Sequence, residues 1–212
     1  MLELGFKTLV AYLLGSVLGS LVMGRLRGVD IRELGSGNAG GTNALRTQGM
    51  KFALGVIVID VGKALLAVGV LPGLDLPLIG IDPSAGRDWL ACTCATAVVV
   101  GHVYPVWYEF RGGKGMATLI GAIAMLEPMA LAPVFVVWLG AVMLSGYVGL
   151  GTMLGAAAVP VYFAATRPAG DPLLVFGLVM AAFIVYTHRS NIDRMRRGIE
   201  NRARRLWLLG PR

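Results

Sequence analysis

Charged side chains are scarce in this chain: they make up 15% of its 212 residues, whereas 56% are hydrophobic. A soluble domain carries charge on about a quarter of its residues. Cysteine is scarcer still, with only Cys92 and Cys94 in an apolar segment. A zinc site needs more ligands and a disulfide between these two would strain the backbone, so we expect two buried free thiols. No long polar linker is visible, which predicts a single domain over residues 1–212.

Six long apolar runs recur along the chain. They are Leu9–Met23, Phe52–Leu71, Trp89–Val100, Met129–Leu144, Thr152–Ala165 and Leu173–Tyr186. Several approach the roughly 20 residues that a helix needs to cross a bilayer. The sequence therefore predicts an all-α, polytopic membrane protein. The first run has no basic segment before it and no small-residue cleavage site after it, so we expect it to be a retained span.

The basic residues are distributed unevenly between the ends of these runs. Most of the 19 lie between the first two runs, after the third run, and in the tail Arg189–Arg212, whereas Lys7, Arg87 and Arg167 fall on the other side. The positive-inside rule therefore predicts an outside N-terminus, an inside C-terminus and an odd number of crossings. Met116–Leu126 is the candidate for a seventh crossing, although its eleven residues rise only about 16 Å. The basic tail is typical of an anchor for anionic lipids, not of a nucleic-acid arm.

Polar residues inside the runs are few. Asp60 and Lys63 are three residues apart on one face of the second run, where side chains at this spacing can pair. Each charge alone would cost roughly 2.5–3.5 kcal/mol at the centre of a membrane helix. We therefore expect a structural ion pair, with a catalytic pair as the alternative. Two G-x-x-x-G patterns predict close helix packing: Gly15 with Gly19, and Gly151 with Gly155.

The first of three polar islands is the glycine-rich stretch Gly35–Arg46. Glycines let the backbone turn sharply and approach a ligand, to which hydroxyls, amides and a guanidinium can donate hydrogen bonds. Thr42 at a helix N-cap would direct Asn43 and Arg46 toward the same ligand. A phosphate ester fits this set of donors best, and an ordinary loop is the alternative.

The second island, residues 101–118, contains Gly112-Gly113-Lys114-Gly115 directly before an apolar run. Backbone N–H groups, a helix N-terminus and a lysine together are typical of a phosphate cradle. This is not a Walker A loop, because Gly115 replaces the required Ser or Thr and Tyr108 replaces the leading glycine. No nucleotide hydrolysis is implied, and a tight glycine turn is the alternative. We assign His102 to a structural hydrogen bond.

The third island, Thr187–Arg194, follows the last run. His188 and Asn191 are three residues apart and share a helical face. A histidine here can act as a base or as a donor to a phosphate, and a satisfied interfacial histidine is the alternative. By the predicted topology all three islands lie on the cytoplasmic side. We therefore expect one polar site at the membrane edge, open to a lipid and to a soluble phosphate ester.

The three islands resemble the signature regions of the bacterial acyl-phosphate:glycerol-3-phosphate acyltransferases: GSGNAGGTNALR at 35–46, GHVYPVWYEFRGGKGMAT at 101–118 and THRSNIDRMRRGIE at 187–200. The resemblance implies a seven-helix enzyme of the bacterial inner membrane with its site on the cytoplasmic face. Such enzymes transfer a fatty acyl group from acyl phosphate to the 1-hydroxyl of sn-glycerol 3-phosphate, giving lysophosphatidic acid and phosphate for phospholipid biosynthesis. No acyl-CoA, acyl carrier protein, metal or other cofactor is expected, and we expect a monomer.

The resemblance also implies roles for individual residues. Those expected to act in catalysis are His188, Asn191, Lys114 and Arg46. Those expected to bind substrate are Ser36, Asn38, Thr42, Asn43, Gly112, Gly113 and Thr152, and those expected to be structural are Asp60, Lys63 and Glu200. The chain departs from the family where such enzymes tend to have Ser-x-x-Ser. Gly149 and Thr152 stand there, so one hydroxyl is kept and a serine contact at position 149 is lost.

An acyl phosphate is already activated, so its transfer needs charge stabilisation and positioning more than a strong nucleophile. The proton of the attacking hydroxyl goes either to His188 or to the phosphate of the donor, and the resemblance favours the phosphate.

Two alternative functions remain. His188 and Asp193 also spell His-x4-Asp, the signature of acyltransferases that use acyl-CoA or acyl carrier protein. On a continuous helix these residues point about 140° apart, so we interpret the match as a coincidence. An anion transporter is the other alternative, because glycine-broken spans also build substrate pathways. Against it, the polar islands gather on one side and no inverted repeat is apparent.

Overall fold

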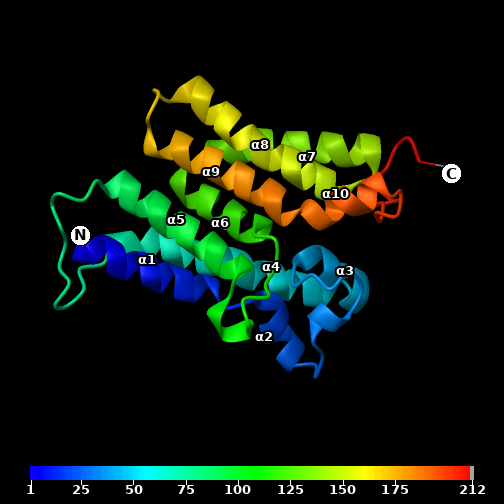
Figure 1. Cartoon of the computed structure of the whole chain (residues 1–212), viewed down its shortest axis with the longest axis horizontal. Helices are drawn as coiled ribbons and strands as arrows, with labels where there is room; N and C mark the ends of the chain where they lie inside the picture. Colours follow the sequence, from blue (N-terminus) through cyan, green and yellow to red (C-terminus); the bar gives the residue numbers. More distant parts are fainter. Residues whose placement is uncertain (211–212) are drawn as a thin grey trace. The chain divides into compact units, whose positions relative to one another are not determined.

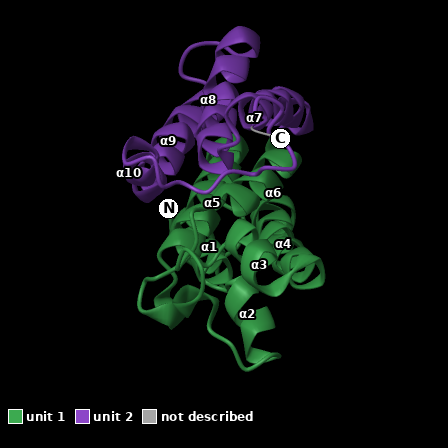
Figure 2. Ribbon diagram, turned by 90° about the vertical axis from the view of Figure 1, so that its right-hand side faces the viewer, with its two compact units in different colours: residues 1–126 green, residues 127–212 purple. Residues whose placement is uncertain are grey.

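The computed structural model describes residues 1–210, and over that range it contains helices and no strand. Arg212 of the predicted basic tail lies outside the described residues. The chain divides into two compact units, unit 1 (Met1–Leu126) and unit 2 (Glu127–Arg212), which Figure 2 colours separately. That the whole chain acts as a single domain stays a prediction.

Unit 1 contains six α-helices, labelled in Figure 1: α1 (Leu2–Gly15), α2 (Gly19–Arg25), α3 (Gly41–Gln48), α4 (Met50–Leu65), α5 (Arg87–Val103) and α6 (Met116–Leu126). A π-helical turn, Leu66–Val70, and a 3-10 turn, Leu71–Gly73, extend α4. Two further 3-10 turns, Ile31–Glu33 and Val106–Tyr108, lie in the connections. The main packing pairs are α1 with α5 and α4 with α6.

Unit 2 contains α7 (Leu131–Ser145), α8 (Val148–Thr166), α9 (Pro172–Thr187) and α10 (Arg189–Arg196), with a 3-10 turn, Pro128–Ala130, before α7. The longest of these helices, α8, packs against both α7 and α9. Local sequence sets two of the boundaries. Gly146 ends α7 in the left-handed conformation, at φ 77°, that glycine adopts most readily. Asp171 begins α9 by accepting a hydrogen bond from the N–H of Leu173, 2.8 Å away.

Four helical segments are long and apolar enough to cross a membrane: Met50–Gly73, Arg87–Tyr108, Pro128–Ser145 and Val148–Thr166. The number rises to six if each of two bent helix pairs counts as one span. The predicted helix Met116–Leu126 is confirmed with those bounds, and it is shorter than the others. The predicted membrane character of the fold therefore agrees with the helix lengths and composition.

The run Leu9–Met23, which we expect to be a retained span, is not one continuous helix. The run is divided into α1 and α2, which meet at an angle of 46° around Ser16–Leu18. A break inside an apolar segment exposes backbone N–H and C=O groups, and these need partners because hydrocarbon supplies none. Asp60 and Lys63 of α4 supply these partners.

The packing role predicted for the glycine pairs is confirmed. A β-carbon on Gly15 would collide with the carbonyl oxygen of Val98 in α5. On Gly151 it would lie 2.9 Å from the carbonyl oxygen of Trp138 in α7. The second glycine of each pair also approaches the backbone of a neighbouring helix. The two cysteines are, as predicted, buried free thiols.

Candidate functional site

A buried ion pair on α4 supplies partners for the broken first span. The Nζ atom of Lys63 donates to the carbonyl oxygens of Gly15 and Val17, each 2.8 Å away. Oδ1 of Asp60 accepts the N–H of Gly19 at 3.0 Å and lies 3.2 Å from the Lys63 ammonium. The predicted pairing of Asp60 with Lys63 is confirmed, and it satisfies backbone groups on both sides of the break.

His102, near the end of α5, is the third member of this buried cluster. Its Nδ1 lies 2.9 Å from Nζ of Lys63 and 3.4 Å from Oδ1 of Asp60, and 2% of the residue is exposed. An ammonium group can only donate, so Nδ1 accepts and a neutral ring carries its proton on Nε2. The predicted hydrogen-bonding role of His102 is confirmed.

The cluster also bears on the transporter alternative. In broken transporter helices, unwound carbonyls coordinate a cation or face a substrate pathway. Here the carbonyls of Gly15 and Val17 are bonded to the Lys63 ammonium of the protein itself. The break in the first span is therefore a structural feature whose carbonyl groups are hydrogen-bonded within the protein.

The loop before α6 folds back on the end of α5. The N–H groups of Gly112 and Gly113 donate to the carbonyl oxygens of Val103 and His102, each at 3.1 Å. A β-carbon on Gly112 would collide with the carbonyl oxygen of His102, and one on Gly113 would collide with its imidazole. Packing thus accounts for both glycines, as the tight-turn alternative predicts. The turn also places half-buried Lys114 two residues before α6 begins, where a phosphate cradle is expected.

The first polar island is organised by Asn43, which is 1% exposed. Its Oδ1 accepts the N–H of Ser36 at 3.0 Å, and its Nδ2 donates to the carbonyl oxygens of Leu34 at 2.9 Å and Ile31 at 3.2 Å. The carboxamide is therefore used to hold the loop that precedes α3. Asn43 therefore has a structural role in the island, with backbone groups as its partners.

Two expectations about this island are wrong. Thr42 does not cap the helix, because α3 begins at Gly41 with Gly40 as its N-cap. Thr42, Asn43 and Arg46 also do not all face one side, since Asn43 is turned inward while Thr42 and Arg46 are exposed. Successive helical residues point about 100° apart, so Asn43 lies on the inner face while its neighbour Thr42 does not. Ser36 is exposed as well, and Asn38 is half-buried.

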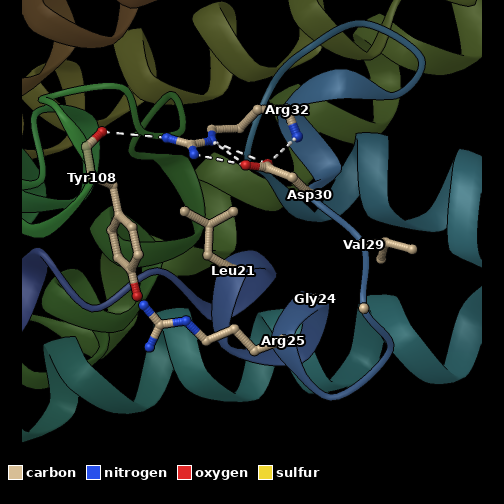
Figure 3. Close-up of a pocket in the computed structure, with 8 residues that line it drawn as sticks. Leu21, Gly24, Arg25, Val29, Asp30, Arg32 and Tyr108 are labelled. Carbon is tan, nitrogen blue, oxygen red and sulfur yellow. Dashed lines mark hydrogen bonds and ion pairs between the residues drawn. The ribbon is translucent and has the colours of Figure 1, made fainter.

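A cavity of about 370 Å³ lies between α2, the following segment and the loop after α5. Figure 3 shows Arg25 and Arg32 on opposite sides of Tyr108. Nη2 of Arg32 pairs with Asp30 at 2.7 Å and its Nη1 donates to the carbonyl oxygen of Tyr108 at 3.3 Å. The Arg25 guanidinium lies 5.6 Å from the centre of the Tyr108 ring.

Hydrogen bonds from Arg32 hold the pKa of Asp30 below its usual range, and the same carboxylate raises the pKa of Arg32. Asp30 therefore neutralises Arg32, and Arg25 is the other cation on the cavity wall. The sequence did not predict this cavity, because its arginines were interpreted only as topology signals. No local pattern connects them with Tyr108, which is 76 positions from Arg32.

The third island lies at a bend of 50° between α9 and α10. Nδ1 of His188 lies 2.7 Å from the carbonyl oxygen of Ile184, which can only accept, so Nδ1 donates and a neutral ring has its lone pair on Nε2. Nδ2 of Asn191 donates to Oε1 of Glu200 at 2.8 Å, and Nε of Arg194 donates to Oε2 at 2.6 Å. Glu200 thus holds Asn191 and Arg194 together, in keeping with the supporting role expected of it.

The positions that depart from the family pattern lie at the start of α8. Gly149 packs directly against Asn191. The hydroxyl of Thr152 donates to the carbonyl oxygen of Val148 at 2.8 Å, and 7% of Thr152 is exposed. The hydroxyl kept at position 152 is therefore engaged with its own helix. That Thr152 contacts substrate stays a prediction.

Asp193 does not partner His188 within the third island. Its side chain is 54% exposed and pairs with Arg197 at 3.1 Å, one turn along α10. His188, by contrast, is 4% exposed and precedes that helix. The geometry supports the interpretation of His-x4-Asp as a coincidence.

The first and second islands belong to unit 1, and the third belongs to unit 2. That all three converge on one site stays a prediction. Within residues 1–210, no group of three or more His, Cys, Asp or Glu side chains is arranged to hold a metal ion.

Comparison with known families gives a match over most of the chain. The family model described as glycerol-3-phosphate acyltransferase matches residues 6–198. A protein of that name from Chlorobaculum parvum is 38% identical over 216 residues, covering 91% of this chain and 93% of its own. Another from Synechococcus elongatus is 42% identical over 195 residues, covering 92% of this chain and 91% of its own.

Two solved structures are also similar. Both are crystal structures of PlsY (YgiH), an integral membrane glycerol 3-phosphate acyltransferase. The glycerol 3-phosphate form is 35% identical with a TM-score of 0.79, and the lysophosphatidic acid form is 36% identical with a TM-score of 0.77. Each alignment covers 94% of both chains.

Proposed function

This chain belongs to the glycerol-3-phosphate acyltransferase family, and we propose that an acyl phosphate is the donor of its acyl group. The enzyme acylates glycerol 3-phosphate to lysophosphatidic acid in phospholipid biosynthesis. The observation that carries the choice of donor is the loop Gly112–Gly115, which holds Lys114 just before the first turn of α6. A cation and a helix N-terminus together suit a phosphate on the donor.

The proposed reaction is a direct transfer. The 1-hydroxyl oxygen of glycerol 3-phosphate attacks the carbonyl carbon of the acyl phosphate, and a new ester bond forms. The bond between that carbon and the phosphate oxygen breaks, and the phosphate leaves with the electron pair. The hydroxyl proton passes to the departing phosphate, so the products are lysophosphatidic acid and inorganic phosphate. Because the donor is activated, the protein contributes orientation and charge stabilisation.

We assign the residues as follows. Lys114 stabilises the phosphate of the donor, and Gly112 and Gly113 shape the turn that presents it. Arg46, with Ser36, Asn38 and Thr42, binds the phosphate ester at the exposed face of the first island. Asn43 acts there by holding the loop, since its carboxamide is bonded to the backbone. His188 and Asn191 orient the substrates, Thr152 lies near them, and Glu200 supports Asn191.

We place the enzyme in the bacterial inner membrane with the N-terminus outside, the C-terminus inside and the reaction on the cytoplasmic side. This follows from the uneven distribution of the basic residues. The proposed topology has seven crossings. The four long helices and the two bent helix pairs make six of them, and α6 is the seventh. We propose a monomer that needs no metal or cofactor.

The donor is tested with purified protein in detergent or liposomes. Palmitoyl phosphate and palmitoyl-CoA are each supplied with glycerol 3-phosphate, and lysophosphatidic acid is measured. We expect lysophosphatidic acid with palmitoyl phosphate as the donor and none with palmitoyl-CoA. Asp193→Asn should keep near-full activity. Product from palmitoyl-CoA that is lost in Asp193→Asn would instead establish the His-x4-Asp mechanism.

A further inference from the structure

We propose that His102 is a positioning residue for acyl transfer, which connects the buried Asp60–Lys63 pair to the loop that presents Lys114. The proposal rests on the proposed function, because it assigns to this loop the phosphate of the acyl donor. The imidazole is fixed on one side by a membrane-buried charge and is packed on the other side against Gly113.

The buried side of His102 is held by a directional contact. Two of the three protons on the Lys63 ammonium point to the carbonyl oxygens of Gly15 and Val17, each at 2.8 Å. The third proton is shared between Nδ1 of His102, at 2.9 Å, and Oδ1 of Asp60, at 3.2 Å. All three members of the cluster are buried, with exposed fractions of 0% for Asp60, 6% for Lys63 and 2% for His102.

Within residues 1–210, the charged side chains in contact with His102 lie on α4. Asp60 and Lys63 both lie on that helix, and the broken span contributes the carbonyl groups that share the ammonium. A hydrogen bond to a buried charge is stronger and more directional than a packing contact. It therefore fixes the plane of the imidazole. An apolar side chain of similar size would be oriented by packing contacts alone.

The other side of the imidazole determines where the loop can lie. The N–H of Gly113 donates to the His102 carbonyl oxygen at 3.1 Å, and the position of its missing β-carbon is occupied by Nε2 of the ring. Gly112 is equally close to the His102 backbone. Lys114 is the next residue, so a shift of the imidazole moves the loop that carries the proposed phosphate ligand.

The test separates positioning from general stability by a double-mutant cycle. Two variants, His102→Asn and Lys114→Ala, are made singly and together, and the binding of a non-hydrolysable acyl phosphonate is measured. Asparagine keeps an acceptor near the place of Nδ1 but removes the ring face against Gly113. We expect each single variant to weaken binding about tenfold or more, and the double variant to bind no more weakly than Lys114→Ala.

Independent effects that multiply in the double variant would overturn the proposal, as would unchanged binding in His102→Asn. If His102→Asn does not fold, Gly113→Ala takes its place, since the added methyl group displaces the loop from the other side of the same contact. The same non-additivity with Lys114→Ala is expected, and multiplying effects would again contradict the account.

The matched control is Cys94→Ala, which removes a buried side chain from the same helix, away from the loop. We expect unchanged binding of the phosphonate. An assay of the wild-type protein distinguishes the role of His102 from the proposed function. If it makes lysophosphatidic acid from palmitoyl phosphate while the cycle is additive, the role of His102 fails and the proposed function stands. If it uses no acyl phosphate, the proposed function itself fails.

Discussion

A β-carbon placed on Gly149 would lie 2.8 Å from Nδ2 of Asn191 and 3.0 Å from its Cβ. The start of α8 and the start of α10 are therefore in contact at a position where only glycine fits without a shift. The serine that the family pattern favours at position 149 would have to displace Asn191 from Glu200. This chain's departure from the pattern thus has a packing reason.

We predict that Gly149→Ser, which restores the family pattern, reduces kcat/KM about tenfold or more. The added side chain moves Asn191, and small displacements of positioning groups have effects of this size. Steady-state assays with acyl phosphate and glycerol 3-phosphate measure the loss. Gly140→Ser is the matched control, because a β-carbon at that position of α7 meets nothing within 4 Å. Equal activity of both variants would show that Asn191 tolerates the shift or is unimportant.

Glu200→Ala should lower both stability and activity. The side chain accepts hydrogen bonds from Asn191 and Arg194, and its loss leaves both without this acceptor. A destabilisation of about 1–3 kcal/mol is expected, since one partner is charged. Thermal unfolding in detergent measures it. Glu200→Gln is the comparison, because it keeps a bond to Asn191 but not the ion pair. It should retain more activity than Glu200→Ala, and the reverse order would contradict the supporting role.

Parts of the fold that follow from uninterrupted local pattern were predictable. Met116–Leu126 is bounded by Gly115 and by Glu127-Pro128, and the helix has those limits. The break in the first span was not predictable from the apolar run Leu9–Met23 itself. It depends on Lys63 and its neighbour Asp60, which lie more than 40 positions along the chain.

The candidate site, like the fold, was predictable from the sequence only in part. The density of donors in Gly35–Arg46 indicated a special loop, but it did not reveal which side chains face outward. That depends on the bonds of Asn43 to Leu34 and Ser36, which turn this side chain inward. Short-range spacing predicts that residues can share a face. It does not predict whether that face is turned toward the backbone or toward a ligand.

His188→Ala should abolish most turnover through misplaced substrates. Its Nδ1 is held by the carbonyl oxygen of Ile184, which fixes the orientation of the ring at the bend before α10. If positioning is its role, the variant should also bind an acyl phosphonate more weakly. Calorimetric titration of the phosphonate measures this. Normal binding combined with lost turnover would contradict positioning and would favour His188 as the proton acceptor.

The Asp30–Arg32 pair predicts a pH dependence of stability. The folded state lowers the pKa of Asp30, so the pair stabilises the protein above the ordinary pKa of the carboxyl and loses this contribution as the pH falls through the lowered value. Asp30→Asn should therefore be less stable than wild type at pH 7 and unfold at a lower temperature. The free energy of unfolding should fall by about 1 kcal/mol or less, because the pair is partly exposed.

The difference between Asp30→Asn and wild type should shrink as the pH falls below about 4, where the carboxyl protonates. Thermal unfolding across the acidic range measures it. Asp75→Asn, which removes an exposed carboxyl in the loop after the extended α4, is the control for the loss of one surface charge. A difference that grows as the pH falls would contradict the assigned direction of the pKa shift.

The central claim, direct transfer from an acyl phosphate held by Lys114, is tested most directly by phosphate release. Purified protein receives palmitoyl phosphate with and without glycerol 3-phosphate, alongside Lys114→Ala. We predict release that requires both substrates and Lys114, with one lysophosphatidic acid formed for each phosphate. Turnover with acyl-CoA but none with acyl phosphate would contradict both the donor and the mechanism.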